Sequence, residues 1–150
     1  MVRISFQDLP RNMFEKLMDM EQFINQSGVS YKLLELIRLR VSQLNGCAYC
    51  IDMHNKELKH LEETDLRLSS LSVWRETPYF DEQEKAVLEF TEKLTLVSKN
   101  IISDEVYENL SSFFSKTEVC FLTLAISQIN LWTRLMKTFK FEPGKYQVKK

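Results

Sequence analysis

Apolar side chains recur at helical spacing along nearly the whole chain, which predicts an all-α protein. Only residues 74–80 read as a true loop, because Pro78 forces the residue before it out of the helical region. No linker or repeat interrupts the pattern, so we expect residues 1–150 to form a single domain, a bundle of about six to seven helices. The predicted helices cover residues 11–25, 30–44, 47–62, 65–72, 81–98, 103–114 and 117–140.

Several helix ends carry stop or cap signals. Asn45-Gly46 closes the second predicted helix, since both residue types tolerate the left-handed conformation that ends a helix. Asp81 precedes Glu84 by three positions, which is the spacing of a capping box. Thr117 is the expected N-cap of the last helix.

The last predicted helix is apolar on nearly all sides. Such a helix lies either at the centre of a core or in a contact between subunits, so we expect the chain to oligomerise. Its most apolar stretch, 120–135, is too short for a membrane span and contains Arg134. Cys120, with no polar pattern around it, is expected to be a plain core residue. In the first helix the residues expected to face inward are Phe14, Leu17, Met18, Met20 and Ile24.

Charge and composition narrow the class of protein. The chain of 150 residues has 20 basic and 21 acidic side chains, a net charge of -1, and so no electrostatic reason to bind nucleic acid or an anionic membrane. Residues 1–10 lack the apolar run of an export signal, so we expect a cytoplasmic protein, with the mildly basic tail 145–150 solvated. Three cysteines, an odd count, do not suit a secreted disulfide framework. In a reducing compartment a close cysteine pair is more typical of redox or metal chemistry.

Residues 45–54 contain the side chains best suited to chemistry, two thiols and an imidazole. At about 100° per residue, Cys47, Cys50 and His54 fall on one apolar face of a helix. His54 follows Cys50 by four positions, close enough on a helix to take the thiol proton. The helix start instead favours a thiolate at Cys47, because unpaired backbone N–H groups lie there. From the residues alone, either sulfur can be the one that attacks.

Two less reactive interpretations fit the same segment. A structural zinc site needs four ligands, whereas this segment supplies three, and His60 points away from His54 on the same helix. The thiols and the imidazole could also be ordinary core residues, since neutral cysteine is common in cores. Glu35 lies opposite the main apolar arc of its helix and by itself reads as a surface residue.

The chain resembles the alkylhydroperoxidase D core of the carboxymuconolactone decarboxylase-like family in the run 35–50, ELIRLRVSQLNGCAYC, and in the His54 that follows. The match continues in order through residues 74–78, 90–95, 122–126 and 129–134. This resemblance implies an all-helical, AhpD-like subunit that assembles into homo-oligomers, often trimers or hexamers.

The same resemblance implies a peroxidase and disulfide-exchange activity. Cys50 would attack a hydroperoxide and Cys47 would resolve the product, while Glu35 and His54 form a proton relay. No metal or flavin cofactor is implied, and a dithiol such as a lipoyl-bearing protein would regenerate the cysteines. Tyr49 stands where some members carry an additional relay histidine. Because a phenol is a poor base near neutral pH, we expect a shorter relay and weak peroxidase activity.

Two other functions remain open beside the peroxidase. One is a thiol–disulfide reductase with incidental peroxidase activity. The other is a non-catalytic helical oligomer whose cysteines bind zinc or only pack. The decarboxylase activity of another branch of the family is not expected, because that branch lacks the cysteine pair.

Overall fold

The computed structural model describes residues 1–148, and within them every regular element is a helix, which confirms the all-α prediction. Seven α-helices and two short 3-10 helices follow one another along this part of the chain. Their bounds are η1 Phe6–Asp8, α1 Met13–Asn25, α2 Tyr31–Leu44, α3 Ala48–His60, α4 Asp65–Ser70, η2 Leu71–Glu76, α5 Glu82–Thr95, α6 Asp104–Ser111 and α7 Lys116–Phe139.

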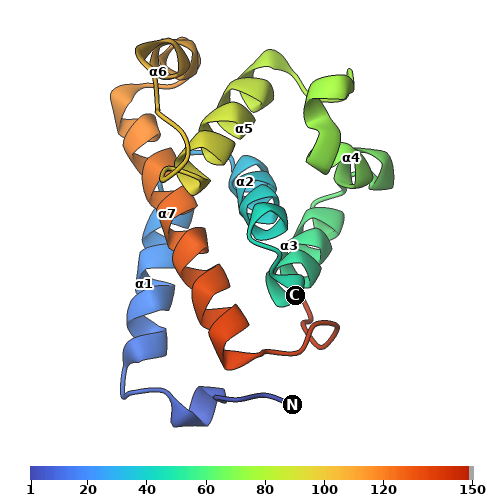
Figure 1. Ribbon diagram of the computed structural model, residues 1–150, viewed down its shortest axis with the longest axis vertical. Coiled ribbons are helices and arrows are strands. Elements are labelled where there is room, and N and C mark those ends of the chain that lie inside the picture. The colour runs from blue at the N-terminus through green and yellow to red at the C-terminus, as the bar shows by residue number, and fades with distance from the viewer. Residues whose placement is uncertain (149–150) are drawn as a thin grey trace.

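Helix α7 runs nearly the length of the molecule, with α1 beside it and α2 and α3 on its other side (Figure 1). Helices α5 and α6 close the upper end, and α4 lies at the side next to α3 (Figure 1). At the lower end the N-terminal segment meets the end of α7, where the N–H groups of Arg3 and Ile4 donate to the carbonyl of Phe139 at 2.8 and 3.4 Å. One end of the bundle is thus closed by segments from both termini.

Helix α2, rather than α7, is the most completely buried element. All six residues 34–39 of α2 are buried, including the charged Glu35 and Arg38, because other helices cover α2 on every side. Two apolar clusters meet on it, one shared with α5, α6 and α7 and the other with α3, α4 and η2. Helix α2 therefore carries its polar side chains into the centre of the protein.

Polar caps begin most of the helices. Ser103 caps α6, and Asp81 with Glu84 forms the predicted capping box of α5. The predicted cap of α7 is wrong: Ser115, not Thr117, accepts from the backbone N–H of Glu118, and the Glu118 side chain completes a second capping box. The S-x-x-E spacing that begins at residue 115 is the sequence pattern of a capping box.

Two predicted boundaries need correction. The predicted loop 74–80 begins as helix, since η2 continues to Glu76; Thr77 then turns extended (φ -122°, ψ 149°), as the residue before Pro78 must. Helix α5 ends at Thr95, and residues 96–99 form turns in place of its expected last turn. Both differences lie at helix ends, where local hydrogen bonding decides the assignment.

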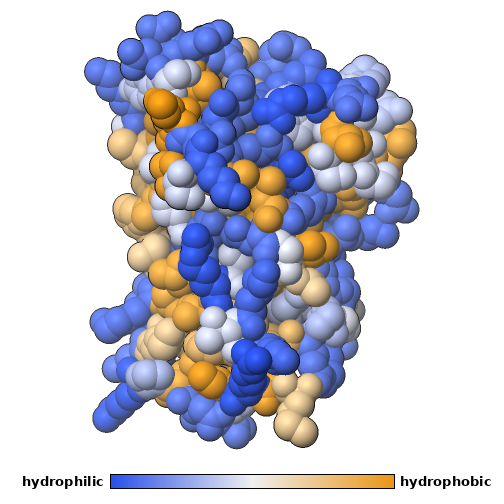
Figure 2. All heavy atoms as spheres, viewed as in Figure 1, coloured by the Kyte–Doolittle hydropathy of each residue, from blue (hydrophilic) through white to orange (hydrophobic). Residues whose placement is uncertain are grey.

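The outer face of the bundle is more apolar than predicted. Phe14, Met18 and Met20 of α1 are 37–40% exposed, and Cys120 of α7 is exposed instead of buried. Figure 2 shows apolar side chains gathered over the flank where α1 and α7 lie side by side. The helical pattern predicted an inward face for these residues, but a helix at the edge of the bundle buries only part of its apolar arc.

Helix α7 is long and apolar enough to cross a membrane. It extends beyond residues 120–135, the stretch predicted from the sequence to be too short for a membrane span. Half of its most apolar window is buried inside the protein, as in the core helix of a globular domain.

The C-terminal segment is not a free tail. Residues 141–148 fold back over α3, where the N–H of Gly144 donates to Asp52 and the ammonium of Lys56 donates to the carbonyls of Gly144 and Tyr146, all at 2.9–3.2 Å. The predicted solvated tail is confirmed for Lys145 and Gln147, which are exposed, and is wrong for Tyr146 and Val148, which are partly buried; Lys149 and Lys150 lie outside the described residues.

Candidate active site

The cysteine pair begins at a turn that α7 holds in place. Gly46 adopts φ +60°, the left-handed conformation that ends α2. The side-chain amide of Asn45 donates to Asn130 Oδ1 and Thr133 Oγ1, both at 2.9 Å, and Lys137 Nζ donates to the Asn45 carbonyl at 2.6 Å. Side chains of α7 therefore fix the point at which α3 starts.

Cys47 is the N-cap of α3, and its Sγ accepts a hydrogen bond from the backbone N–H of Cys50 at 3.4 Å. A hydrogen bond from the Cys50 side chain lowers the pKa of Cys47 to about 7, helped by that N–H and by the charge of Lys137 and opposed by burial. The same S–H···S contact, with burial, raises the pKa of Cys50. Cys47 is thus the more acidic of the two thiols, and Cys50 is the one that retains its proton more firmly.

Glu35 and His54 form a buried pair between α2 and α3. Glu35 Oε2 and His54 Nδ1 lie 2.7 Å apart, and Glu35 Oε1 accepts from Arg38 Nη1 at 2.7 Å. The three side chains are at most 2% exposed, and Arg38 Nη2 reaches Asn25 at 2.7 Å. Burial raises the pKa of Glu35, but the charges and hydrogen bonds of His54 and Arg38 outweigh it and hold the pKa below its usual value. Glu35 is therefore a carboxylate that can stabilise an imidazolium.

The imidazole is oriented by this carboxylate. Because Glu35 accepts from Nδ1, neutral His54 carries its hydrogen there and a lone pair on Nε2. Nε2 is buried and has no hydrogen-bond partner among residues 1–148. The direct bond to Cys50 that the i, i+4 spacing allows is therefore not formed, although both side chains border the same space. His54 is positioned as a base whose accepting atom is free.

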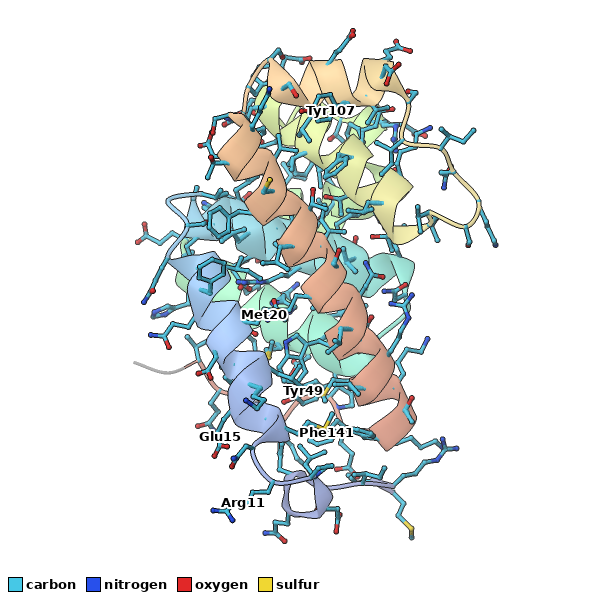
Figure 3. All side chains as sticks on the ribbon, turned by 90° about the vertical axis from the view of Figure 1, so that its left-hand side faces the viewer. Arg11, Glu15, Met20, Tyr49, Tyr107 and Phe141 are labelled. Atoms are coloured by element: carbon cyan, nitrogen blue, oxygen red, sulfur yellow. The ribbon has the colours of Figure 1, made fainter. Side chains whose placement is uncertain are left out.

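That space is a cavity of about 490 Å³ with mostly apolar walls. Cys50, His54 and Glu35 line it, whereas Cys47 does not. Figure 3 shows Tyr49 and Phe141 together in the interior between α1 and α7, with ring centroids 5.5 Å apart. The aromatic residues that line the cavity are Phe6, Phe14, Tyr31, Tyr49, Trp132 and Tyr146.

The structure brings together all four residues singled out in the sequence, Glu35, Cys47, Cys50 and His54. The helical pattern placed Glu35 at the surface, and that prediction is wrong because α2 has no solvent-facing side at this point. His60 also lines the cavity, although it lies on another face of α3 from His54. Within the described part of the chain, no group of three or more His, Cys, Asp or Glu side chains is arranged to hold a metal.

Three further residues of the site were not predicted from the sequence. Arg38 stands one helical turn after Glu35, a spacing that could have indicated an ion pair. Trp132 on α7 and Tyr146 near the C-terminus reach the cavity from distant parts of the chain. No local pattern marks either of them.

Comparisons with known proteins find matches in sequence and in fold. The sequence pattern of the Carboxymuconolactone decarboxylase family matches residues 11–93, a stretch that contains Glu35, both cysteines and His54. The chain is 37% identical over 133 residues to the uncharacterized protein YdfG of Bacillus subtilis (strain 168), covering 89% of this chain and 90% of that protein.

Solved structures share the fold. A protein of unknown function from Agrobacterium tumefaciens, suggested to be the antioxidant defence protein AhpD, superposes with a TM-score of 0.92 at 34% identity, covering 97% of this chain and 100% of that one. An alkylhydroperoxidase AhpD core from Ralstonia eutropha JMP134, an uncharacterized peroxidase-related protein, has a TM-score of 0.79 at 19% identity, covering 89% of this chain and 72% of that one. At 19% identity the likeness concerns the fold alone.

Proposed function

The chain belongs to the carboxymuconolactone decarboxylase family and has the AhpD-like fold, and we propose that it is a thiol-dependent peroxidase that reduces organic hydroperoxides through Cys47 and Cys50. The observation that carries the proposal is the placement of one thiol, Cys50, and an oriented base, His54, on the wall of a single apolar cavity.

In the first step Cys50 becomes a nucleophile. Its proton passes to Nε2 of His54, and the Glu35 carboxylate stabilises the imidazolium that forms. The Cys50 sulfur then attacks the terminal oxygen of the hydroperoxide, the O–O bond breaks, and the imidazolium protonates the departing alkoxide to an alcohol. The Cys50 thiol is oxidised to a sulfenic acid and the peroxide is reduced by two electrons.

In the second step Cys47 resolves the sulfenic acid. Cys47 is the more acidic thiol, with a pKa of about 7; its thiolate attacks the Cys50 sulfur, and the hydroxide that leaves takes up a proton to become water. Cys47 does not line the cavity, which favours this role over direct attack on peroxide. An external dithiol, such as a lipoyl-bearing protein, then reduces the disulfide by exchange.

The size of the cavity favours an organic substrate over hydrogen peroxide. Water occupies about 30 Å³ in the liquid, so a cavity of about 490 Å³ has room for much more than a peroxide group. Its apolar walls would bury an alkyl or aromatic substituent and gain the free energy of removing that surface from water.

Trapping of the sulfenic acid with dimedone after one equivalent of cumene hydroperoxide tests the mechanism. We expect an adduct on Cys50 in the Cys47→Ser variant, no adduct in Cys50→Ser, and a disulfide in the wild-type protein. An adduct confined to Cys47 would show that Cys47 attacks the peroxide and Cys50 resolves the product. The absence of both adduct and disulfide would refute the peroxidase.

A thiol–disulfide reductase is the second candidate, favoured by the low pKa of Cys47 at the start of α3. In that case Cys47 attacks a substrate disulfide and Cys50 releases the product. Turnover of lipoamide disulfide that greatly exceeds turnover of cumene hydroperoxide would support this function instead.

We also propose a cytoplasmic homo-oligomer, a trimer or hexamer. The exposed apolar residues of α1, led by Phe23 at 57% exposure, support a subunit contact on the flank that α1 shares with α7 (Figure 2). Sedimentation equilibrium measures the number of subunits, and a monomeric mass at micromolar concentration would contradict this proposal.

A further inference from the structure

Two buried ring nitrogens in the described residues have no hydrogen-bond partner, Nε2 of His54 and Nε1 of Trp132. A buried polar atom left without a partner costs about 1–3 kcal/mol, so each one calls for an explanation. Both side chains line the same cavity, although His54 comes from α3 and Trp132 from α7.

The two nitrogens have opposite requirements. The indole Nε1 of Trp132 carries a hydrogen and can only donate. Nε2 of neutral His54 carries a lone pair and accepts, because its Nδ1 hydrogen is held by Glu35. A single group that satisfies both must offer a lone pair to the indole and a hydrogen to the imidazole. Hydroxyl and hydroperoxyl groups have this composition, whereas a pure acceptor such as a carboxylate does not.

We propose that Trp132 Nε1 donates a hydrogen bond to the substituted oxygen of the hydroperoxide, the one that leaves as alkoxide, and that Trp132 thereby positions the substrate and stabilises the charge that develops there. This inference rests on the proposed peroxidase function. As the Cys50 sulfur bonds to the terminal oxygen and the O–O bond breaks, the electron pair moves to the leaving oxygen. The indole N–H stabilises this charge until the His54 imidazolium supplies the proton.

The indole is held by packing rather than by polar contacts. Its ring meets that of Phe14 edge to face, with centroids 6.1 Å apart, and it packs against the apolar cluster that contains both cysteines. Trp74, the other tryptophan, already donates its Nε1 hydrogen to Glu92 at 2.8 Å and does not line the cavity. Trp74 therefore provides a matched control within the same chain.

The kinetic test compares leaving groups. We expect Trp132→Phe, which keeps an aromatic ring and removes the N–H, to lower kcat/KM for cumene hydroperoxide about tenfold, the loss of one hydrogen bond. With a peroxybenzoic acid, whose carboxylate leaves readily, the loss should be less than about threefold because less charge needs stabilisation. Trp74→Phe should change neither rate. Equal losses with both peroxides, or no loss, would overturn the inference, since a structural role of Trp132 does not depend on the leaving group.

The second readout is the indole N–H resonance in an ¹⁵N-labelled protein, with 2-phenyl-2-propanol, the alcohol product, as the probe. The Trp132 resonance, assigned by its loss in Trp132→Phe, should move downfield on titration while that of Trp74 stays fixed. An unmoved Trp132 resonance at saturating alcohol would contradict the inference, whether or not the methyl signals of Met53 and Met136 in the cavity respond. A downfield shift in a protein that reduces no peroxide would refute the peroxidase and leave the hydroxyl-binding site standing. Peroxide turnover by a protein whose Trp132 resonance does not shift would refute the role of Trp132 and leave the peroxidase function standing.

Discussion

Glu35 Oε2 and His54 Nδ1 lie 2.7 Å apart at the centre of the bundle, 19 positions apart in sequence and both at most 2% exposed. The pair joins α2 to α3 and is completed by Arg38, so a carboxylate, an imidazole and a guanidinium are buried together. Charges buried in this way are stable only as a set, because removal of one leaves another unpaired in a medium of low polarity.

Glu35→Gln tests the importance of this charge. We expect the variant to lose about 3 kcal/mol of unfolding free energy, because Arg38 is left buried without its partner. Peroxide turnover should fall about a hundredfold, since the amide cannot stabilise the imidazolium. Denaturant unfolding and steady-state kinetics measure the two effects. Glu21→Gln, another carboxylate on the cavity wall, is the control and should alter both far less.

Titration of the cysteine pair tests the assignment of Cys47 as the more acidic thiol. The ultraviolet absorbance of the thiolate should rise with an apparent pKa of about 7 in the wild-type protein. In Cys50→Ala the pKa of Cys47 should be higher, because the S–H group that stabilises the thiolate is gone. Cys120→Ala, which removes the exposed cysteine, should leave the pKa of about 7 unchanged. A midpoint near the usual thiol pKa in the wild type would contradict the assignment.

Stability should follow the same ionisation. The folded pKa of Cys47, about 7, is below its reference value of 9.0, so between these pH values the unfolded state binds more protons and unfolding free energy rises with pH. The contribution is complete above pH 9.0 and is lost as the pH falls through about 7. Cys50 has a raised pKa and acts in the opposite sense, lowering stability above the reference value of 9.0. Denaturant unfolding across this range, with Cys47→Ser as the variant in which the rise disappears, measures the effect.

Asn45→Ala tests the clamp that α7 places on the turn before Cys47. Loss of the two 2.9 Å hydrogen bonds to Asn130 and Thr133 should reduce the unfolding free energy by about 2 kcal/mol and slow peroxide reduction, because the start of α3 is no longer fixed. The exposed Asn109 of α6 supplies the control, Asn109→Ala. Equal stability of the two variants would show that the turn holds its conformation without the two side-chain hydrogen bonds to Asn130 and Thr133.

Tyr146→Ala tests the role of the C-terminal segment as a cavity wall. Tyr146 lines the cavity and donates its hydroxyl hydrogen to Glu57 of α3. Removal of the ring should open the cavity and raise the alkylation rate of Cys50 by iodoacetamide several-fold, because access limits the reaction of a buried thiol. Tyr107→Ala on α6, remote from the site (Figure 3), should leave the rate unchanged. An unchanged rate in Tyr146→Ala would mean that reagents enter by another side.

Local sequence determined much of this protein. Helical periodicity predicted seven helices close to their observed positions, because spacing and caps depend on residues a few positions apart. For the same reason Cys47, Cys50 and His54 fall on one face of α3 and are all buried. The family resemblance predicted Glu35 as the partner of His54, whereas helical periodicity alone had placed Glu35 at the surface.

Tertiary structure decided what depends on neighbours distant in sequence. Glu35 is buried because helices on every side cover α2, and a helical pattern describes only one helix at a time. The turn that starts α3 is held by Asn130, Thr133 and Lys137 of α7, while the hydrogen bond from Cys50 and the charge of Lys137 lower the pKa of Cys47. Trp132 reaches the cavity in the same way, through the packing of α7, a helix distant in sequence from α3. Ionisation and hydrogen bonding depend on three-dimensional surroundings, so helix positions could be predicted from the sequence while the state of each functional group could not.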